Sequence, residues 1–141
     1  MSADLYSGRV LELAAQARPV GSPAAQQAHA LRVSRLCGSE VEVGLTLAEG
    51  AVTDFAIDPR ACALGQASAA ILADHVIGAT PDEIRQARDG LAAMLRQGGQ
   101  PPGGRFWELR YLEPVRDYPP RHASTLLAFE AAVAALERAG A

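Results

Sequence analysis

Two cysteines are the residues of this sequence with the greatest capacity for chemistry. Cys37 and Cys62 are the only cysteines in the chain of 141 residues. As thiolates, they bind soft metal ions and attack sulfur. A structural disulfide is not expected unless the protein enters an oxidising compartment. The other interpretation is that both cysteines pack as small apolar side chains. Which interpretation holds depends on whether the fold brings them together.

The segments around the cysteines predict that both lie at one end of a β-sheet. Residues 31–36 and 41–47 alternate apolar and polar side chains, which indicates two half-buried strands. A third strand returns after a short turn and is expected to end at 58–59. Cys37 lies in the turn before the second strand, and Cys62 follows the third. Because neighbouring antiparallel strands run in opposite directions, the two cysteines are expected at the same sheet end.

Helices are predicted for most of the remaining chain. Apolar residues at helical spacing indicate helices over residues 3–17, 61–77 and 121–138. Another helix begins at the capping box of residues 80–83 and ends at Gly98 and Gly99. Residues 98–104 are a loop rich in glycine and proline, and the pattern of residues 106–111 does not identify an element. This order predicts an α+β domain, a three-stranded antiparallel sheet with helices packed on one face.

Composition limits the classes of function. Hydrophobic residues make up 49% and charged residues 21%, enough for one domain with a sizeable core. The net charge of -3 argues against nucleic-acid binding. No apolar run approaches the roughly 18 residues that cross a membrane. The start of the sequence lacks a basic segment followed by an apolar run, so we expect no secretory signal and a cytoplasmic protein.

The three histidines differ in how well they could share a metal ion with the cysteines. His75 lies on the same predicted helix as Cys62 but about 20 Å further along it. His29 precedes the first cysteine by roughly 26 Å of extended strand. His122 begins the last helix and is the histidine that remains free to approach. Asp58 is a weaker candidate, because capping of the turn at Pro59 explains it better.

Both cysteines lie in local settings that suit a reactive thiol. Cys62 lies at a predicted helix start, where free N–H groups and the helix dipole stabilise a thiolate. Cys37 precedes Gly38, which permits a close backbone approach. These features favour a functional pair, although the packing interpretation stays open on the residues alone.

Four segments carry a family resemblance: residues 18–21 (Arg-Pro-Val-Gly), 36–38 (Leu-Cys-Gly), 62–69 (Cys-Ala-Leu-Gly-Gln-Ala-Ser-Ala) and 118–126 (Tyr-Pro-Pro-Arg-His-Ala-Ser-Thr-Leu). They resemble the U-type iron–sulfur cluster scaffold family of IscU, SufU and the NifU N-terminal domain, with a SufU-like spacing between the last two. The resemblance implies one such domain over residues 1–141. Ser39 stands where the family has an Asp ligand, and Ala123 where it has a third cysteine.

The resemblance implies a scaffold or sulfur-relay protein, not an enzyme. Cys37, Cys62 and His122 would hold a transient iron–sulfur cluster or zinc, with a cysteine desulfurase as partner. A symmetric homodimer, in which each chain supplies both cysteines, would complete a four-thiolate site. The alternative is a degenerate, metal-free paralogue that acts as an adaptor for the desulfurase or another assembly partner. An enzyme with a cysteine nucleophile and His122 as base is disfavoured, because no orienting acid is identifiable.

Overall fold

A computed structural model describes residues 5–141 as an α+β fold. In chain order the elements are α2 (Gly8–Gln16), η1 (Pro23–Ala25), β1 (Ala28–Ser34), β2 (Ser39–Ala48), β3 (Ala51–Arg60), α3 (Ala63–His75), α4 (Pro81–Gln97), η2 (Gly104–Asp117), η3 (Pro119–Arg121) and α5 (His122–Arg138). The strands form one antiparallel sheet in the order β1-β2-β3. The predicted fold class is therefore confirmed.

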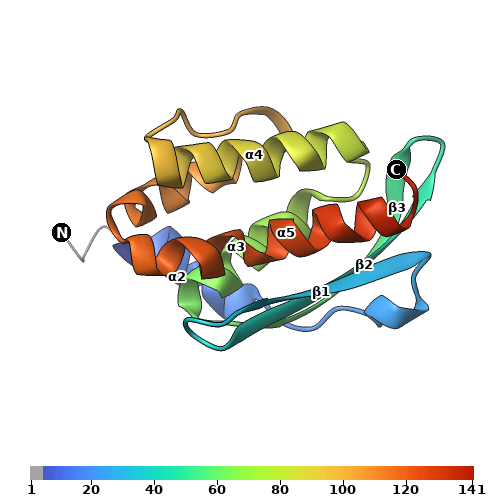
Figure 1. Cartoon of the computed structure of the whole chain (residues 1–141), viewed down its shortest axis with the longest axis horizontal. Helices are drawn as coiled ribbons and strands as arrows, with labels where there is room; N and C mark the ends of the chain where they lie inside the picture. The colour runs from blue at the N-terminus through green and yellow to red at the C-terminus, as the bar shows by residue number, and fades with distance from the viewer. Residues whose placement is uncertain (1–4) are drawn as a thin grey trace.

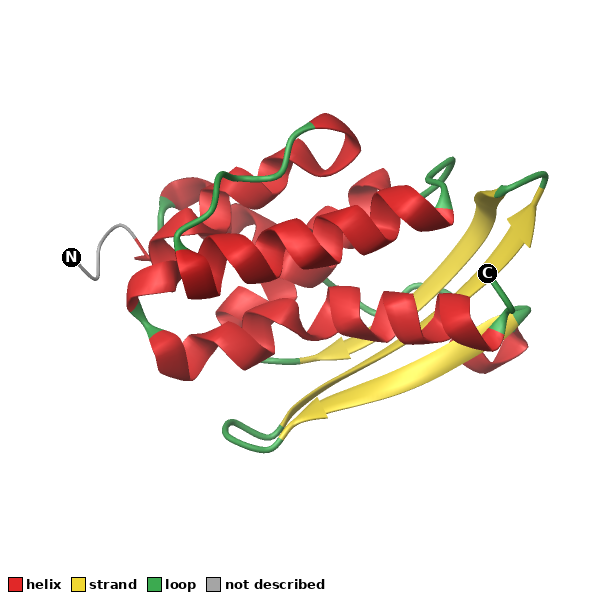
Figure 2. Cartoon of the chain, turned by 45° about the horizontal axis from the view of Figure 1, so that its top comes forward, coloured by secondary structure: helices red, strands yellow, loops and turns green. Residues whose placement is uncertain are grey.

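The long helices cover one face of the sheet (Figure 2). In Figure 1, α5 lies across β1 and β2, and α4 lies on the side of α5 away from the sheet. Helix α3 packs beside α5 and against β3, and α2 packs against α3. The alternating residues Val41, Val43 and Leu45 of β2 are fully buried beneath these helices. The alternation of apolar and polar residues along β2 thus gives the sheet the apolar face that packs against the helices.

Three predicted boundaries were wrong. β1 begins at Ala28, three residues before the expected strand. β3 does not stop at Asp58 and Pro59 but continues to Arg60. Proline is tolerated there because β3 is an edge strand, so the missing N–H need not enter a ladder. The helix expected over residues 3–17 is observed as α2, which begins at Gly8 with Ser7 as its cap, and residues 3–4 of the expected helix lie outside the described residues.

The fourth helix follows its sequence signals closely. The Thr80 hydroxyl accepts a hydrogen bond of 3.2 Å from the Glu83 N–H, and the Glu83 carboxylate accepts one of 3.0 Å from the Thr80 N–H. Gly98 ends the helix in the left-handed conformation at φ 68°. The predicted capping box and glycine stop are therefore confirmed.

Residues 106–111, whose type the pattern did not identify, lie in the 3₁₀ segment η2, which has a break at Phe106. A buried carboxylate attaches this segment to two helices. Glu108 accepts hydrogen bonds of 2.7 Å from Arg9 of α2 and 2.9 Å from His75 of α3. This ion-pair cluster holds η2 against the end of the bundle, next to the segment that leads into α5.

The short helix η1 covers part of the other sheet face. A Cβ atom built on Gly44 of β2 would lie 2.7 Å from the Pro23 Cα, well inside van der Waals contact. We therefore expect Gly44→Ala to lower the free energy of unfolding by about 1–3 kcal/mol. Urea denaturation measures this loss of free energy. Gly103→Ala is the control, because a Cβ on Gly103 meets nothing within 4 Å. Equal stability of the two variants would contradict this packing.

Within residues 5–141, no helix combines the length and the apolar character that crossing a bilayer requires.

Candidate functional site

The two cysteines lie at one end of the sheet, in the segments that connect its strands to the next elements of the chain. Cys37 lies in the turn between β1 and β2, and Cys62 is the residue immediately before α3. Ser39 at the start of β2 pairs with Ser34 at the end of β1, and the next residue of β2, Glu40, pairs with Arg60 at the end of β3. The turn between β1 and β2 therefore lies next to the end of β3. The prediction that both cysteines belong at the same end of the sheet is confirmed.

Ser39 links the two cysteines by hydrogen bonds. Its hydroxyl oxygen lies 2.9 Å from the Cys37 Sγ and accepts a bond of 3.3 Å from the Cys62 backbone N–H. That N–H is one of the donors that a helix start leaves without an intrahelical partner. Ser39 thus caps α3 from the neighbouring strand, and its own hydroxyl proton is available to the Cys37 sulfur.

Ser124 lies against the same pair from the start of α5. The Cys62 thiol donates to the Ser124 Oγ over 3.5 Å, and the Ser124 hydroxyl donates to the Arg121 carbonyl over 3.2 Å. Ser124 is only 1% exposed. Two thiols and two hydroxyls, from four different segments, therefore form one polar cluster.

Gly65 of α3 makes this approach of α5 possible. A Cβ atom at Gly65 would lie 3.1 Å from the Ser124 carbonyl oxygen and 2.7 Å from the Ala61 Cβ. The missing side chain lets the first turn of α3 contact the first turn of α5 directly. This close contact of the two helix starts places Cys62 next to Ser124.

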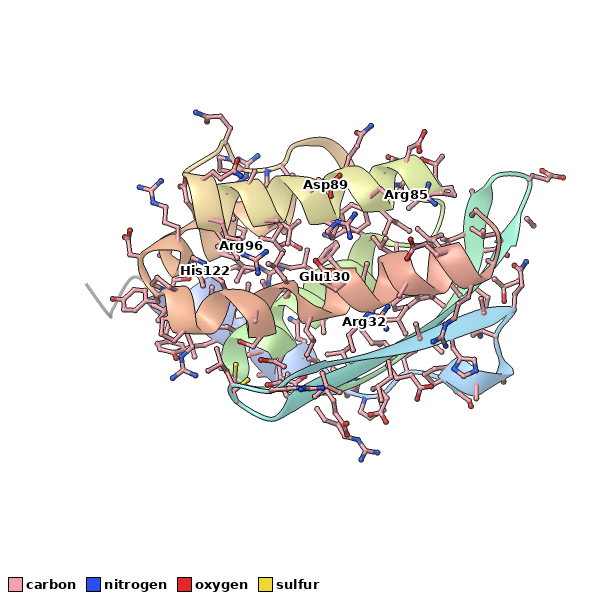
Figure 3. All side chains as sticks on the ribbon, viewed as in Figure 1. Arg32, Arg85, Asp89, Arg96, His122 and Glu130 are labelled. Carbon is pink, nitrogen blue, oxygen red and sulfur yellow. The ribbon has the colours of Figure 1, made fainter. Side chains whose placement is uncertain are left out.

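His122 does not join the cysteines, although it was predicted as their third ligand. Its ring is 8% exposed and its Nε2 donates over 3.1 Å to the carbonyls of both Val115 and Arg116. Two helix positions two residues apart point about 200° apart, so Ser124 projects from the start of α5 on another side than His122. His122 is labelled in Figure 3. The predicted three-residue ligand set is therefore not assembled.

The remaining candidates lie in other interactions. His29 is hydrogen-bonded to Glu42 at 3.0 Å, and His75 to Glu108 at 2.9 Å. Asp58 lies within β3 and pairs with Arg60 instead of capping a turn. Among residues 5–141, no group of three or more His, Cys, Asp or Glu side chains could hold a metal ion. Metal binding by Cys37 and Cys62 stays a prediction.

Serine hydroxyls favour the thiolate form of Cys37. The bond to the Ser39 hydroxyl has the largest effect, burial opposes it, and Ser34 and Ser124 act in the same direction as Ser39. The net result lowers the pKa of the Cys37 thiol from 9.0 to about 7. The thiolate is the form that binds metal and attacks sulfur.

We expect the alkylation rate of Cys37 to reach half of its plateau near pH 7, because its lowered pKa lets the thiolate predominate above about that pH. Iodoacetamide kinetics across the pH range measure this in a Cys62→Ser background, where one thiol reports. Ser39→Ala is expected to move the midpoint upward, toward the ordinary value of 9.0. A midpoint that Ser39→Ala leaves in place would show that the hydroxyl does not stabilise the thiolate.

The surface beside Cys37 is open and partly apolar. A hollow there is lined by Leu36, Cys37, Tyr118, Pro120 and Arg121. Leu36 is 77% exposed, an unusual degree for a leucine. Both cysteines are free thiols, with Cys37 exposed and Cys62 half-buried. A protein partner could therefore reach Cys37 directly.

Sequence reasoning missed the serines that contact the thiols, Ser34, Ser39 and Ser124. Ser39 was noted only as the residue that replaces an Asp ligand, and the third-cysteine position was assigned to Ala123. The residue that contacts the cysteines is Ser124, its neighbour. A usable signal would have been the polar residues on either side of Ala123, compared by the direction in which each one projects from the helix.

Comparison with known proteins gives a family and related sequences. Residues 5–102 match the family described as NifU-like N terminal domain. Over 102 residues the chain is 26% identical to the iron–sulfur cluster assembly scaffold protein IscU of Thermotoga maritima, a match that covers 72% of this chain and 71% of that protein. The family match contains both cysteines, whereas Ser124 and His122 lie beyond it.

Solved structures share the whole fold. A NifU-like N-terminal protein from Brucella abortus is 48% identical, with a TM-score of 0.95 over 99% of this chain and 96% of that chain. A putative iron–sulfur cluster assembly scaffold protein for the SUF system, from Fervidobacterium islandicum, is 20% identical with a TM-score of 0.83. That match covers 96% of this chain and 99% of the other, and at this identity it concerns the fold alone.

Proposed function

We propose a function that starts from the family: the chain belongs to the NifU-like N-terminal domain family, and it serves iron–sulfur cluster assembly as a scaffold or sulfur relay. A nascent cluster, or a metal ion such as zinc, is held as cargo at Cys37 and Cys62. A cysteine desulfurase supplies the sulfur, and the protein acts in the cytoplasm. No enzymatic step of its own is part of the proposal, because His122, the candidate base, is bonded to backbone carbonyls.

The observation that carries this proposal is the hydrogen-bonded pair of thiols around Ser39. The turn of Cys37 and the helix start of Cys62 are brought together by a shared hydroxyl, which favours a joint role. The lowered pKa of Cys37 and the open surface beside it suit the receipt of sulfur from a partner. Buried, inert cysteines would need neither feature.

The two cysteine thiols supply half of the ligands that a [2Fe–2S] cluster requires. A [2Fe–2S] cluster takes four thiolates, and one chain offers two. A symmetric dimer would complete the set with the same two cysteines of a second copy. A site with few protein ligands would also release its cargo readily, which suits transfer to another protein.

Anaerobic reconstitution tests the proposal. We expect purified protein, given ferrous iron, cysteine and a cysteine desulfurase, to acquire thiolate-to-iron absorption bands that elute with a dimer. The Cys37→Ser variant should lose these bands. Wild-type protein without any cluster would contradict the proposal, and a cluster on a strictly monomeric protein would contradict the dimer.

The alternative function is that of a metal-free adaptor for the desulfurase or another assembly partner. The incomplete ligand set among residues 5–141 favours it. Isothermal titration with a desulfurase distinguishes the two functions. An adaptor would bind equally well as wild type and as Cys37→Ser/Cys62→Ser, and its trace zinc and iron would not change between them.

A further inference from the structure

We propose that Arg32 and Arg138 keep the free edge of β1 closed to a second copy of this chain. In the sheet, β1 pairs with β2 on one side only, so its other side is an edge (Figure 1). An edge strand presents unpaired backbone groups, to which another strand can add. The two arginines occupy backbone carbonyls that an added strand would need.

Hydrogen bonds from the arginines identify which residues of β1 face the edge. The Arg138 guanidinium donates over 2.9 Å to the His29 carbonyl. The Arg32 guanidinium, labelled in Figure 3, donates over 2.9 Å to the Leu31 carbonyl. In an antiparallel ladder, successive residues direct their N–H and C=O groups alternately toward the partner strand and away from it. His29 and Leu31 therefore face the free edge, and so does Val33.

Two apolar side chains lie exposed beside this edge. Leu31 is 46% exposed and Val33 is 52% exposed. Their register partners on β2, Glu42 and Glu40, alternate with the buried Val41. Leu31 and Val33 therefore lie on the sheet face opposite the helices. Exposed apolar residues on an edge strand favour association through strand pairing.

A second β1 is the strand that fits this edge. Antiparallel pairing of two copies about Leu31 would place the two Leu31 side chains opposite each other, and each Val33 opposite the partner's His29. The same patch of both copies would then cover the apolar side chains that one copy exposes. This pairing needs the carbonyls of His29 and Leu31 as acceptors, and the arginines hold both.

Closing this edge also keeps the chain available for the dimer in which cysteines meet, and this consequence rests on the proposed function. Cys37 lies six residues beyond Leu31. At about 3.3 Å per residue, edge pairing about Leu31 would separate the two Cys37 turns by about 40 Å. Two chains paired at β1 could not share one cluster.

Sedimentation velocity of metal-free protein tests the inference. Arg32→Ala/Arg138→Ala should dimerise at least roughly tenfold more tightly than the wild type, because four carbonyls become available in each dimer. Both arginine hydrogen bonds are exposed, so the fold should remain intact, which circular dichroism checks. Arg18→Ala/Arg110→Ala is the matched control: it removes the same charge from segments outside β1. This control and Arg32→Lys/Arg138→Lys, which retains the charge and the donors, should sediment as the wild type.

A third substitution locates the interface. Adding Leu31→Lys to the double alanine variant should restore the monomer, because two lysines would lie opposite each other. In the dimer, the Leu31 amide should exchange its hydrogen more slowly than in the wild type.

Three results would each overturn the inference: a double alanine variant that sediments as the wild type, a control pair that dimerises equally, or a dimer that Leu31→Lys leaves intact. A chelator removes metal throughout. Failure of cluster reconstitution would therefore contradict the proposed function without changing the result at the β1 edge.

Discussion

Replacing Cys37 and Cys62 together with serine is expected to lower zinc affinity by at least roughly 100-fold. A structural zinc site with four ligands gains about 10–16 kcal/mol on binding, so one thiolate accounts for about 3 kcal/mol, a factor of roughly 100. Serine keeps the size of the side chain, and neither cysteine is fully buried. The free energy of unfolding should therefore change little. Chelator competition and urea denaturation measure the two quantities.

His122→Gln is the informative control for this result. The imidazole donates to the carbonyls of Val115 and Arg116, and glutamine retains a side-chain N–H for that role. We expect its zinc affinity to equal that of the wild type. A loss as large as that of the cysteine variant would mean that His122 is a ligand and that the described arrangement around it is wrong.

Glu108→Ala is expected to lower the free energy of unfolding by about 2–3 kcal/mol. The carboxylate is 5% exposed and joins η2 to two helices through Arg9 and His75. Removing one partner of a fully buried pair costs about 3–5 kcal/mol, and we take a lower value because Arg9 and His75 stay partly exposed.

A matched control lies on the same segment. Among the described residues Glu113 pairs with Arg116, three positions along the chain, at 3.6 Å, and both side chains are partly exposed. Glu113→Ala should therefore cost less than about 1 kcal/mol in urea denaturation. Similar losses from Glu108→Ala and Glu113→Ala would show that the buried cluster does not hold η2 in place.

The same carboxylate predicts a pH dependence of stability. Burial alone would raise the pKa of Glu108, but hydrogen bonds from His75 and Arg9 outweigh it and hold the pKa below its ordinary value of 4.5. A carboxyl whose pKa is depressed by folding stabilises the protein above its unfolded pKa. That contribution is lost as the pH falls below about 4.5. Glu108→Gln should therefore show a shallower loss of stability in this acid range.

Much of the fold could be predicted because its signals are local. The alternation along residues 41–47 and the capping box at 80–83 each specify an element without reference to the rest of the chain. The end of β3 was missed because proline interrupts a strand by default, and only its edge position makes Pro59 acceptable. Segment η2 was missed because a 3₁₀ run held by the buried Glu108 has no helical apolar period.

The site could be predicted only in part, for a related reason. The topology of two antiparallel strand pairs brings Cys37 and Cys62 together, and topology is readable from the sequence. The choice between His122 and Ser124 depends on the rotation of α5 about its axis. Packing against the sheet and against Gly65 sets that rotation. The sequence predicts where the helix begins, but not which side of its first turn faces the thiols.

X-ray absorption at the zinc edge, on freshly loaded wild-type protein, tests whether Cys37 and Cys62 hold the cargo. We predict two sulfur scatterers at about 2.3 Å from each zinc ion, with the remaining scatterers being oxygen and none having the multiple-scattering signature of imidazole. The Cys37→Ser variant should retain one sulfur. A spectrum without sulfur, or one with two sulfurs that Cys37→Ser leaves unchanged, would contradict the assignment of Cys37 and Cys62 as the residues that hold the cargo.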